Sequence, residues 1–111
     1  MTYKLVFRIR ERYFNQIVDG TKKIEIRRDV PFWQLRLANI FGKDAVQGYF
    51  QLGSSLSGVE IEAVFICGKR KHVRECRGVE RIDTPSNFSE QGKQDVDTPT
   101  CLAFHLGDVV E

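Results

Sequence analysis

Positions 19–28, DGTKKIEIRR, place a lysine, a glutamate and an arginine together at the start of an expected strand. Lys22 and Arg27 supply fixed positive charge for a phosphate or a base carbonyl, and an arginine can bind such a group with two parallel hydrogen bonds. Glu25 could accept a hydrogen bond from an exocyclic amine, such as that of cytosine, or could orient the two cations. In a desolvated cleft, Lys22 could also act as a base or a nucleophile.

The same residues have a simpler interpretation, in which they pair across the solvated face of an edge strand. Exposed ion pairs of this kind contribute only about 0–1 kcal/mol. The position of the charges favours a site instead. They follow Gly20, at which a helix is expected to end, so a turn brings backbone N–H groups close to the start of the strand. A lysine at position 22 could then reach an anion.

Hydrophobic spacing predicts the elements that position these residues. In residues 3–9, YKLVFRI, apolar and polar side chains alternate, which predicts a half-buried strand. Residues 11–19 change to helical spacing, which predicts a helix with one apolar face. Residues 22–28 return to alternation, with the isoleucines on one face and the charged side chains on the other, and Pro31 closes the strand or confines it to an edge of the sheet.

The rest of the chain predicts further elements from its spacing and its turn residues. They are a helix over 32–41, a short strand over 48–52, a turn over 53–58, a strand over 59–67, a strand over 72–82 with a bulge at Gly78, a polar loop over 83–100 and a last strand over 101–110. Within the helix, one apolar stripe holds Phe32, Leu35 and Ala38 with Asn39, and another holds Leu37, Ile40 and Phe41. Because most strands are not separated by helix-length segments, the pattern predicts an α+β chain rather than a doubly wound parallel sheet. A small closed or partly open barrel would hide the edges of such short strands.

The charged segment also carries a resemblance to a known family. GTKKIEIR fits the pattern G-x-K-x-x-E-x-R through Gly20, Lys22, Glu25 and Arg27. It resembles the signature of the ASCH domain family, whose members are small barrels similar to the PUA domain, and the preceding LVFRIRERYFNQIVDG resembles the first strand and helix of that family. The resemblance implies a single domain over residues 1–111. It implies a small PUA-like β-barrel of about five or six strands, with a helix packed at the barrel opening and the motif residues lining a cleft beside that helix.

The resemblance also implies a function. ASCH domains are generally thought to bind RNA or nucleotides, and some members are enzymes. One group deacylates acetylated cytidine nucleosides with the motif lysine, a later glutamate and a threonine at the position that Glu25 holds here. This chain keeps Lys22 but lacks that threonine nucleophile. A ribonuclease activity is also described for the family, so a small hydrolase that uses Lys22 and Glu25 is the alternative to a binding module.

A second basic segment lies at positions 69–81, which hold six lysines and arginines against two glutamates. A solvated hairpin and a nucleic-acid-facing patch explain it equally well. It contains no aromatic residue, which favours contact with phosphates over base stacking. Two arginines at the end of the first strand could extend this patch to the cleft. The predicted nucleic-acid-binding residues are Arg8, Arg10, Lys22, Glu25, Arg27, Lys69, Arg70, Lys71 and Arg74.

Other reactive residues give weaker signals. His105 is expected to be a buried, hydrogen-bonded histidine, and one further imidazole in the chain is too few for a histidine metal site. No metal or cofactor is expected. The three cysteines are expected to be buried free thiols because they sit beside apolar residues. A carboxylate from the polar loop could assist Lys22 in catalysis, although loop carboxylates are usually solvated; the candidates are Glu90, Asp95 and Asp97.

Composition bounds the range of functions. The chain has 111 residues and a net charge of +2, which suits one domain with one core and a modest cleft. It has no apolar run of the roughly 20 residues that a membrane helix needs, and MTYKLVFRIRERYF lacks a signal-peptide core, so a cytoplasmic protein without a membrane partner is expected. The expected partner is RNA or a nucleotide. A protein-interaction module is a further alternative, and it predicts that Lys22→Ala and Arg27→Ala leave partner binding intact.

Overall fold

The computed structural model describes residues 1–49, 55–86, 88 and 99–110. These residues form three helices and six strands. In chain order they are β1 (Tyr3–Arg8), α1 (Glu11–Val18), β2 (Ile24–Arg28), α2 (Pro31–Phe41), α3 (Lys43–Tyr49), β3 (Ser55–Leu56), β4 (Ile61–Cys67), β5 (Arg70–Asp83) and β6 (Thr100–Val109). The first strand and the first helix match their predicted bounds to within a residue.

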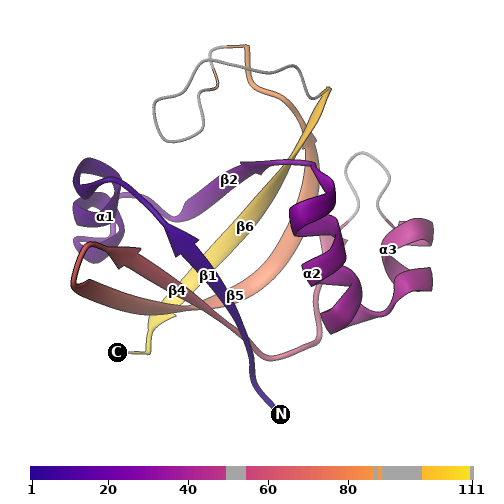
Figure 1. Cartoon of the computed structure of the whole chain (residues 1–111), viewed down its shortest axis with the longest axis horizontal. Helices are drawn as coiled ribbons and strands as arrows, with labels where there is room; N and C mark the ends of the chain where they lie inside the picture. Colours follow the sequence, from indigo (N-terminus) through magenta and orange to yellow (C-terminus); the bar gives the residue numbers. More distant parts are fainter. Residues whose placement is uncertain (50–54, 87, 89–98, 111) are drawn as a thin grey trace.

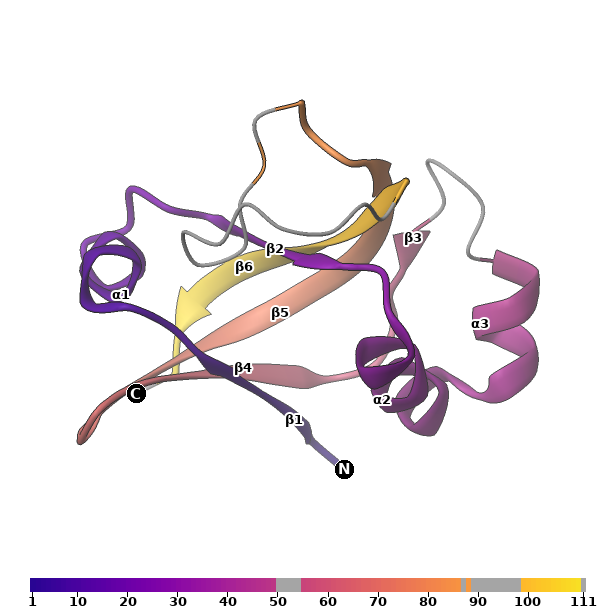
Figure 2. The same ribbon diagram turned by 45° about the horizontal axis from the view of Figure 1, so that its top comes forward.

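The strands form one mixed sheet that curls into a half-barrel (Figures 1 and 2). Its order is β1-β4-β5-β6-β2, with the two-residue β3 paired to β5. β1 and β4 are parallel, and the other pairs are antiparallel. The prediction of a small α+β chain with a barrel-like sheet is therefore confirmed.

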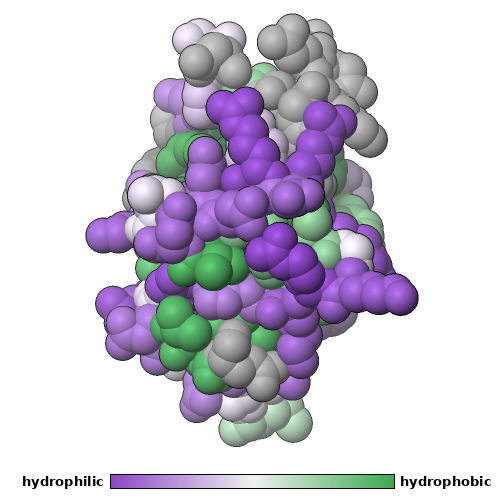
Figure 3. All heavy atoms as spheres, turned by 90° about the vertical axis from the view of Figure 1, so that its left-hand side faces the viewer, coloured by the Kyte–Doolittle hydropathy of each residue, from purple (hydrophilic) through white to green (hydrophobic). Residues whose placement is uncertain are grey.

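An open seam separates β1 from β2, because these strands are the two ends of the order. Each of the two strands leads into a helix. α1 lies at one end of the half-barrel, and α2 with α3 lies at the other (Figure 1). The end that carries α1 presents mostly hydrophilic side chains, with smaller apolar patches between them (Figure 3). The helices thus flank the seam rather than cover the outside of the sheet.

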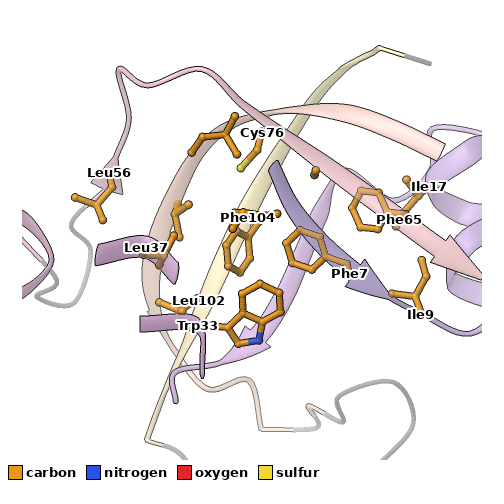
Figure 4. Packing of buried hydrophobic residues seen from close by; sticks show 14 of the residues in the cluster. Phe7, Ile9, Ile17, Trp33, Leu37, Leu56, Phe65, Cys76, Leu102 and Phe104 are labelled. Carbon is orange, nitrogen blue, oxygen red and sulfur yellow. The ribbon is translucent and has the colours of Figure 1, made fainter. Parts of the chain in front are cut away.

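Aromatic rings fill the concave side of the sheet (Figure 4). The Phe7 ring lies 4.9 Å from the Trp33 ring, 5.2 Å from the Phe65 ring and 5.0 Å from the Phe104 ring, measured between centroids. All four side chains are buried. Rings at these distances add about 0.5–1.5 kcal/mol per pair to the free energy gained from burying their area. The core thus fixes β1, α2, β4 and β6 against one another.

Predictions for the middle of the chain are correct only in part. The helix over 32–41 is present, and its predicted stripe with Leu37 packs on the core beside Trp33, whereas Phe32 and Leu35 of the other stripe are exposed. The first two residues of the expected strand over 48–52 end α3, a helix that the sequence did not predict, and the others lie outside the described residues. The expected turn over 53–58 contains β3, whose pairing with β5 supplies order that no local pattern signals.

The later strands agree better with prediction. β4 begins two residues after the expected position, and β5 extends slightly beyond its predicted range at both ends. The expected bulge is confirmed, because the register of β5 against β6 shifts between Cys76 and Gly78. In β6, Leu102 and Phe104 share one face of the strand and are fully buried. The polar loop over 83–100 lies largely outside the described residues.

The cysteines give a first testable prediction. Cys76 and Cys101 are buried free thiols, as expected, and Cys67 is partly exposed. Burial raises the pKa of the Cys76 thiol to about 11, although the thiol donates a hydrogen bond to the Gly78 carbonyl. A thiol in the unfolded chain has a pKa of about 8.5. The folded-state pKa is the higher one, so this contribution to stability is complete below about pH 8.5 and is lost as the pH rises toward 11.

We expect the urea midpoint of the wild type to fall between pH 8 and pH 10.5 by more than that of Cys76→Ala, and Cys76 to resist iodoacetamide at pH 8 in the native state. The same reaction in denaturant provides the control. Rapid native-state alkylation of Cys76 at pH 8 would contradict the burial of its thiol.

Candidate functional site

The charged face of β2 points into the half-barrel. Glu25 pairs in register with Phe104, and Arg27 with Leu102, so these side chains share the concave face of the sheet. Glu25 is 2% exposed and Arg27 is 5% exposed. The alternation predicted for this strand is correct, but the interpretation as a solvated face is wrong. The charges occupy the interior face of β2, and Ile24 lies exposed on the other.

The three motif residues form a continuous chain of ionic contacts. The Lys22 ammonium lies 2.6 Å from Glu25 Oε1, and Arg27 Nε donates to Glu25 Oε2 at 2.8 Å. Arg27 Nη2 donates to the backbone carbonyl of Arg8 at 3.3 Å, which joins β2 to β1 across the open seam. One buried carboxylate therefore fixes two cations, and one of these spans the gap between the edge strands.

Lys22 is positioned by the end of α1. Gly20 adopts φ +85°, a left-handed conformation that suits glycine and confirms the predicted helix end. The Lys22 N–H then donates to the Gln16 carbonyl at 3.0 Å, and the Lys22 ammonium lies 5.0 Å from the centre of the Tyr13 ring. The turn thus places the ammonium beside Glu25.

Lys22 and Glu25 line a small cavity of about 160 Å³ next to α1. The other residues around it are Ile9, Tyr13, Ile24, Ile26 and Phe88. Sites for cofactors and similar small molecules usually measure about 300–1,000 Å³, so this cavity is too small to enclose a nucleotide. The cavity lies beside α1, where the sequence predicted a cleft, but it is smaller than a cleft for a nucleotide must be.

A larger groove of about 620 Å³ lies between β1 and α2, and Arg27 of β2 also lines it. Four cationic residues and three aromatic residues line it: Lys4, Arg8, Arg27 and Arg36 with Tyr3, Phe32 and Trp33. Of the described residues that line this groove, none carries a carboxylate. Arg27 therefore connects the predicted motif to a basic groove that the motif alone did not reveal.

The rim of the groove on α2 is a stacked pair of side chains. α2 begins at Pro31, a residue favoured at the first helical position, and this start places Phe32 and Arg36 one turn apart. The Arg36 guanidinium carbon lies 3.5 Å from the centre of the Phe32 ring, and Arg36 Nη1 donates to the Phe32 carbonyl at 2.8 Å. Phe32 is nevertheless 52% exposed. The helical spacing of the two residues was the signal that could have indicated this rim.

The opposite wall is the free edge of β1. The N–H groups of Tyr3 and Ile9 donate to the carbonyls of Glu60 and Ile66, at the two ends of β4. The odd-numbered residues of β1 therefore direct their backbone groups toward β4. Alternate residues of a strand direct these groups to opposite sides, so the N–H and C=O groups of Lys4, Val6 and Arg8 face the seam. The hydrogen bond from Arg27 to the Arg8 carbonyl agrees with this direction. The groove thus has backbone donors and acceptors along one wall.

The second basic segment does not line the groove. Lys69 lies exposed in the turn between β4 and β5, and Lys71 is exposed on β5. Arg70 donates to Asn15 Oδ1 at 3.1 Å, and its guanidinium lies over the Phe14 ring. These contacts hold the hairpin against α1, on the end of the molecule that faces the viewer in Figure 3.

Two further predicted residues lie apart from the large groove as well. Arg10 is exposed at the start of α1, where its carbonyl accepts from the Phe14 N–H. Arg74 donates to the Ile17 carbonyl at 2.9 Å and to the Gly107 carbonyl at 3.1 Å. A cation at the C-terminal end of a helix is favourable, so Arg74 has a structural role between α1 and β6.

We therefore expect Arg74→Ala to lower the free energy of unfolding by about 1.5–3 kcal/mol, because hydrogen bonds of a charged donor contribute this much. The affinity of the folded variant for a single-stranded RNA probe should equal that of the wild type, whatever that affinity is. Urea unfolding measures the first effect, and a binding titration below the unfolding transition measures the second. A stable variant with weakened binding would instead assign Arg74 to the ligand site.

The weaker candidates have structural surroundings of their own. His105 is not buried as expected, because its partly exposed ring contacts Glu80 at 3.0 Å on the outer side of the sheet. The loop carboxylates Glu90, Asp95 and Asp97 lie outside the described residues. Within the described part of the chain, no three His, Cys, Asp or Glu side chains are grouped so that they could hold a metal ion.

Comparison with known proteins adds no relative to this description. No protein-family model, curated protein or solved structure matches the chain. None of the helices in the described residues combines the length and the apolar character that crossing a membrane requires.

Proposed function

We propose that this protein binds RNA or a nucleotide in the groove between β1 and α2. The observation that carries the proposal is the lining of the groove, in which four cations and three aromatic residues surround about 620 Å³. Cations that follow a phosphate backbone, combined with rings that stack on bases, are the usual means of binding single-stranded nucleic acid. The groove volume suits about one nucleotide unit, so an unpaired strand or a free nucleotide fits better than a duplex.

The proposal includes membership of the ASCH family, with its motif residues in defined roles. Arg27 contacts the ligand from the floor of the groove, and Glu25 orients Arg27 through the 2.8 Å hydrogen bond. The Lys22 ammonium pairs with the other carboxylate oxygen of Glu25, Oε1. This arrangement supports a binding role over the hydrolase alternative, because the Lys22 amine is engaged as a cation by a carboxylate at 2.6 Å.

A titration of fluorescent single-stranded RNA tests the proposal. Arg36→Ala and Lys4→Ala remove cations from the groove, and we expect each to weaken binding several-fold and to lower the slope of log K against log salt by about 0.7, the value for one phosphate contact on a single strand. Lys69→Ala removes an exposed cation from the β4–β5 turn and is the matched control. Weaker binding in Lys69→Ala together with unchanged binding in Arg36→Ala would overturn the assignment of the groove.

A further inference from the structure

The side chain of Arg27 is built as a fixed anion receptor. Glu25 holds its Nε, and the Arg8 carbonyl holds its Nη2. Its Nη1 makes no hydrogen bond with the residues that the structure describes, and the side chain lines the groove. Arg27 is 95% buried and its guanidinium is held at two of its three nitrogens, which leaves the third for a ligand in the groove that this side chain lines.

The surroundings of Arg27 favour a compact anion over an extended one. The guanidinium carbon lies 5.3 Å from the centre of the Phe7 ring and 5.8 Å from that of the Trp33 ring, so apolar walls exclude water around the charge. Electrostatic attraction strengthens as the local dielectric constant falls. Because Arg27 lines the groove but is only 5% exposed, a group that contacts it must enter the groove end first.

We propose that the groove recognises a terminal phosphate monoester, carried by a mononucleotide or by the end of an RNA strand. This inference rests on the proposed function and narrows its ligand. A terminal phosphate has about two negative charges at pH 7 and only one attached chain. An internal phosphodiester has one charge and a chain on both sides, so it cannot reach the floor without bringing a second nucleotide into the groove.

The remaining residues fit the rest of such a ligand. Arg8 and Lys4 lie on the β1 wall and can balance the second negative charge, and the exposed Phe32 ring at the rim can stack on the base. Arg27 differs from these side chains in being fixed before the ligand binds, which gives it the geometric specificity of a guanidinium fork.

The test compares four probes on the wild-type protein: one short RNA with a 5′-phosphate, the same RNA with a 3′-phosphate, the same RNA with hydroxyls at both ends, and inorganic phosphate as a competitor. We expect one of the phosphorylated strands to bind about 10- to 100-fold more tightly than the hydroxyl strand, as one added charge-assisted contact to a buried guanidinium implies. The favoured end identifies the source of the phosphate. The difference in affinity between the phosphorylated and the hydroxyl strand should shrink below about pH 6, where the monoester gains a proton. Inorganic phosphate should compete with the phosphorylated strand for the groove.

Arg27→Lys tests the receptor directly. It keeps the charge but loses the planar guanidinium. The ratio of the affinities for the phosphorylated and the hydroxyl strand should therefore fall to near one, while the dependence of binding on salt remains. The thermal transition of the variant is measured beside the wild type, and the comparison of strands on wild-type protein does not depend on how the variant folds. Equal binding of all three strands would overturn this inference and leave the proposed function standing. Absence of binding to any strand would overturn both.

Discussion

Glu25→Ala is expected to lower the free energy of unfolding by about 3–5 kcal/mol, the usual cost of removing one partner from a buried ion pair. The carboxylate lies between the Lys22 ammonium at 2.6 Å and the Arg27 Nε at 2.8 Å. Its removal leaves two cations facing each other, and Arg27 remains buried among aromatic rings without a counter-charge. The cost therefore arises from the charge left behind and from the emptied space.

The chain contains a matched control for this prediction. Glu75 and Arg77 form a second Glu–Arg pair, also two residues apart on one strand, with an Arg77 Nη2 to Glu75 Oε1 distance of 3.2 Å. Both side chains are exposed, so Glu75→Ala should change the free energy of unfolding by less than about 1 kcal/mol. Urea unfolding at pH 7 measures both variants. If Glu25→Ala lost as little stability as Glu75→Ala, the pair of Glu25 and Arg27 would be solvated in solution and not buried.

A cost of this size would not by itself explain why the pair is there. Buried ion pairs can often be replaced by apolar residues of similar volume without loss of stability, because the attraction between the charges does little more than offset their desolvation. The pair of Glu25 and Arg27 is better explained by its position. It fixes a guanidinium at the floor of a basic groove, where an apolar side chain could bind no anion.

The sequence allows the first part of this arrangement to be predicted. The alternation in β1 and the helical spacing in α1 are local patterns, and Gly20 marks the helix end by a conformational requirement of its own. The alternation correctly placed Glu25 and Arg27 on one side of β2, and the turn after the expected helix end at Gly20 brings Lys22 beside them, so the three residues do lie together.

The rest depended on contacts between distant parts of the chain. Alternation separates the two faces of β2 but does not say which one is inside, and that choice is made by the register against β6 about 80 residues later. The two apolar stripes of α2 were equally plausible until the packing of Trp33 against Phe7 turned the stripe with Leu37 toward the core. The large groove forms only when β1 and α2 are brought together, so its lining could not be predicted from either segment alone.

Trp33→Ala is the second substitution with a large expected effect. The Trp33 side chain is buried, stacks on Phe7 at 4.9 Å and packs at a tilt against Phe104 at 5.5 Å, measured between ring centroids. Replacing a buried tryptophan by alanine usually lowers the free energy of unfolding by about 3–5 kcal/mol, through lost transfer free energy and the cavity that remains. We expect a loss of this size here, because Trp33 anchors α2 to the core and also supports the ring wall around Arg27.

The neighbouring aromatic residue should behave in the opposite way. Phe32 is exposed, and its ring contacts the Arg36 guanidinium at 3.5 Å and the Trp33 ring edge-to-face at 5.1 Å. The first contact contributes about 0.5–1 kcal/mol and the second about 0.5–1.5 kcal/mol, so Phe32→Ala should reduce stability by no more than about 2 kcal/mol. It should weaken RNA binding by about 1–3 kcal/mol, the contribution of one stacked base, which is roughly a 5- to 150-fold loss of affinity.

These two variants separate the fold from the site. Urea unfolding and titration with a single-stranded RNA are measured on both proteins, at a temperature at which each is folded. A large stability loss in Trp33→Ala with a small one in Phe32→Ala tests the packing of α2, whatever the ligand is. Weak binding confined to Phe32→Ala and the cation variants would place the base at the rim of the groove. Full binding by Phe32→Ala would exclude stacking there and leave the cations as the basis of recognition.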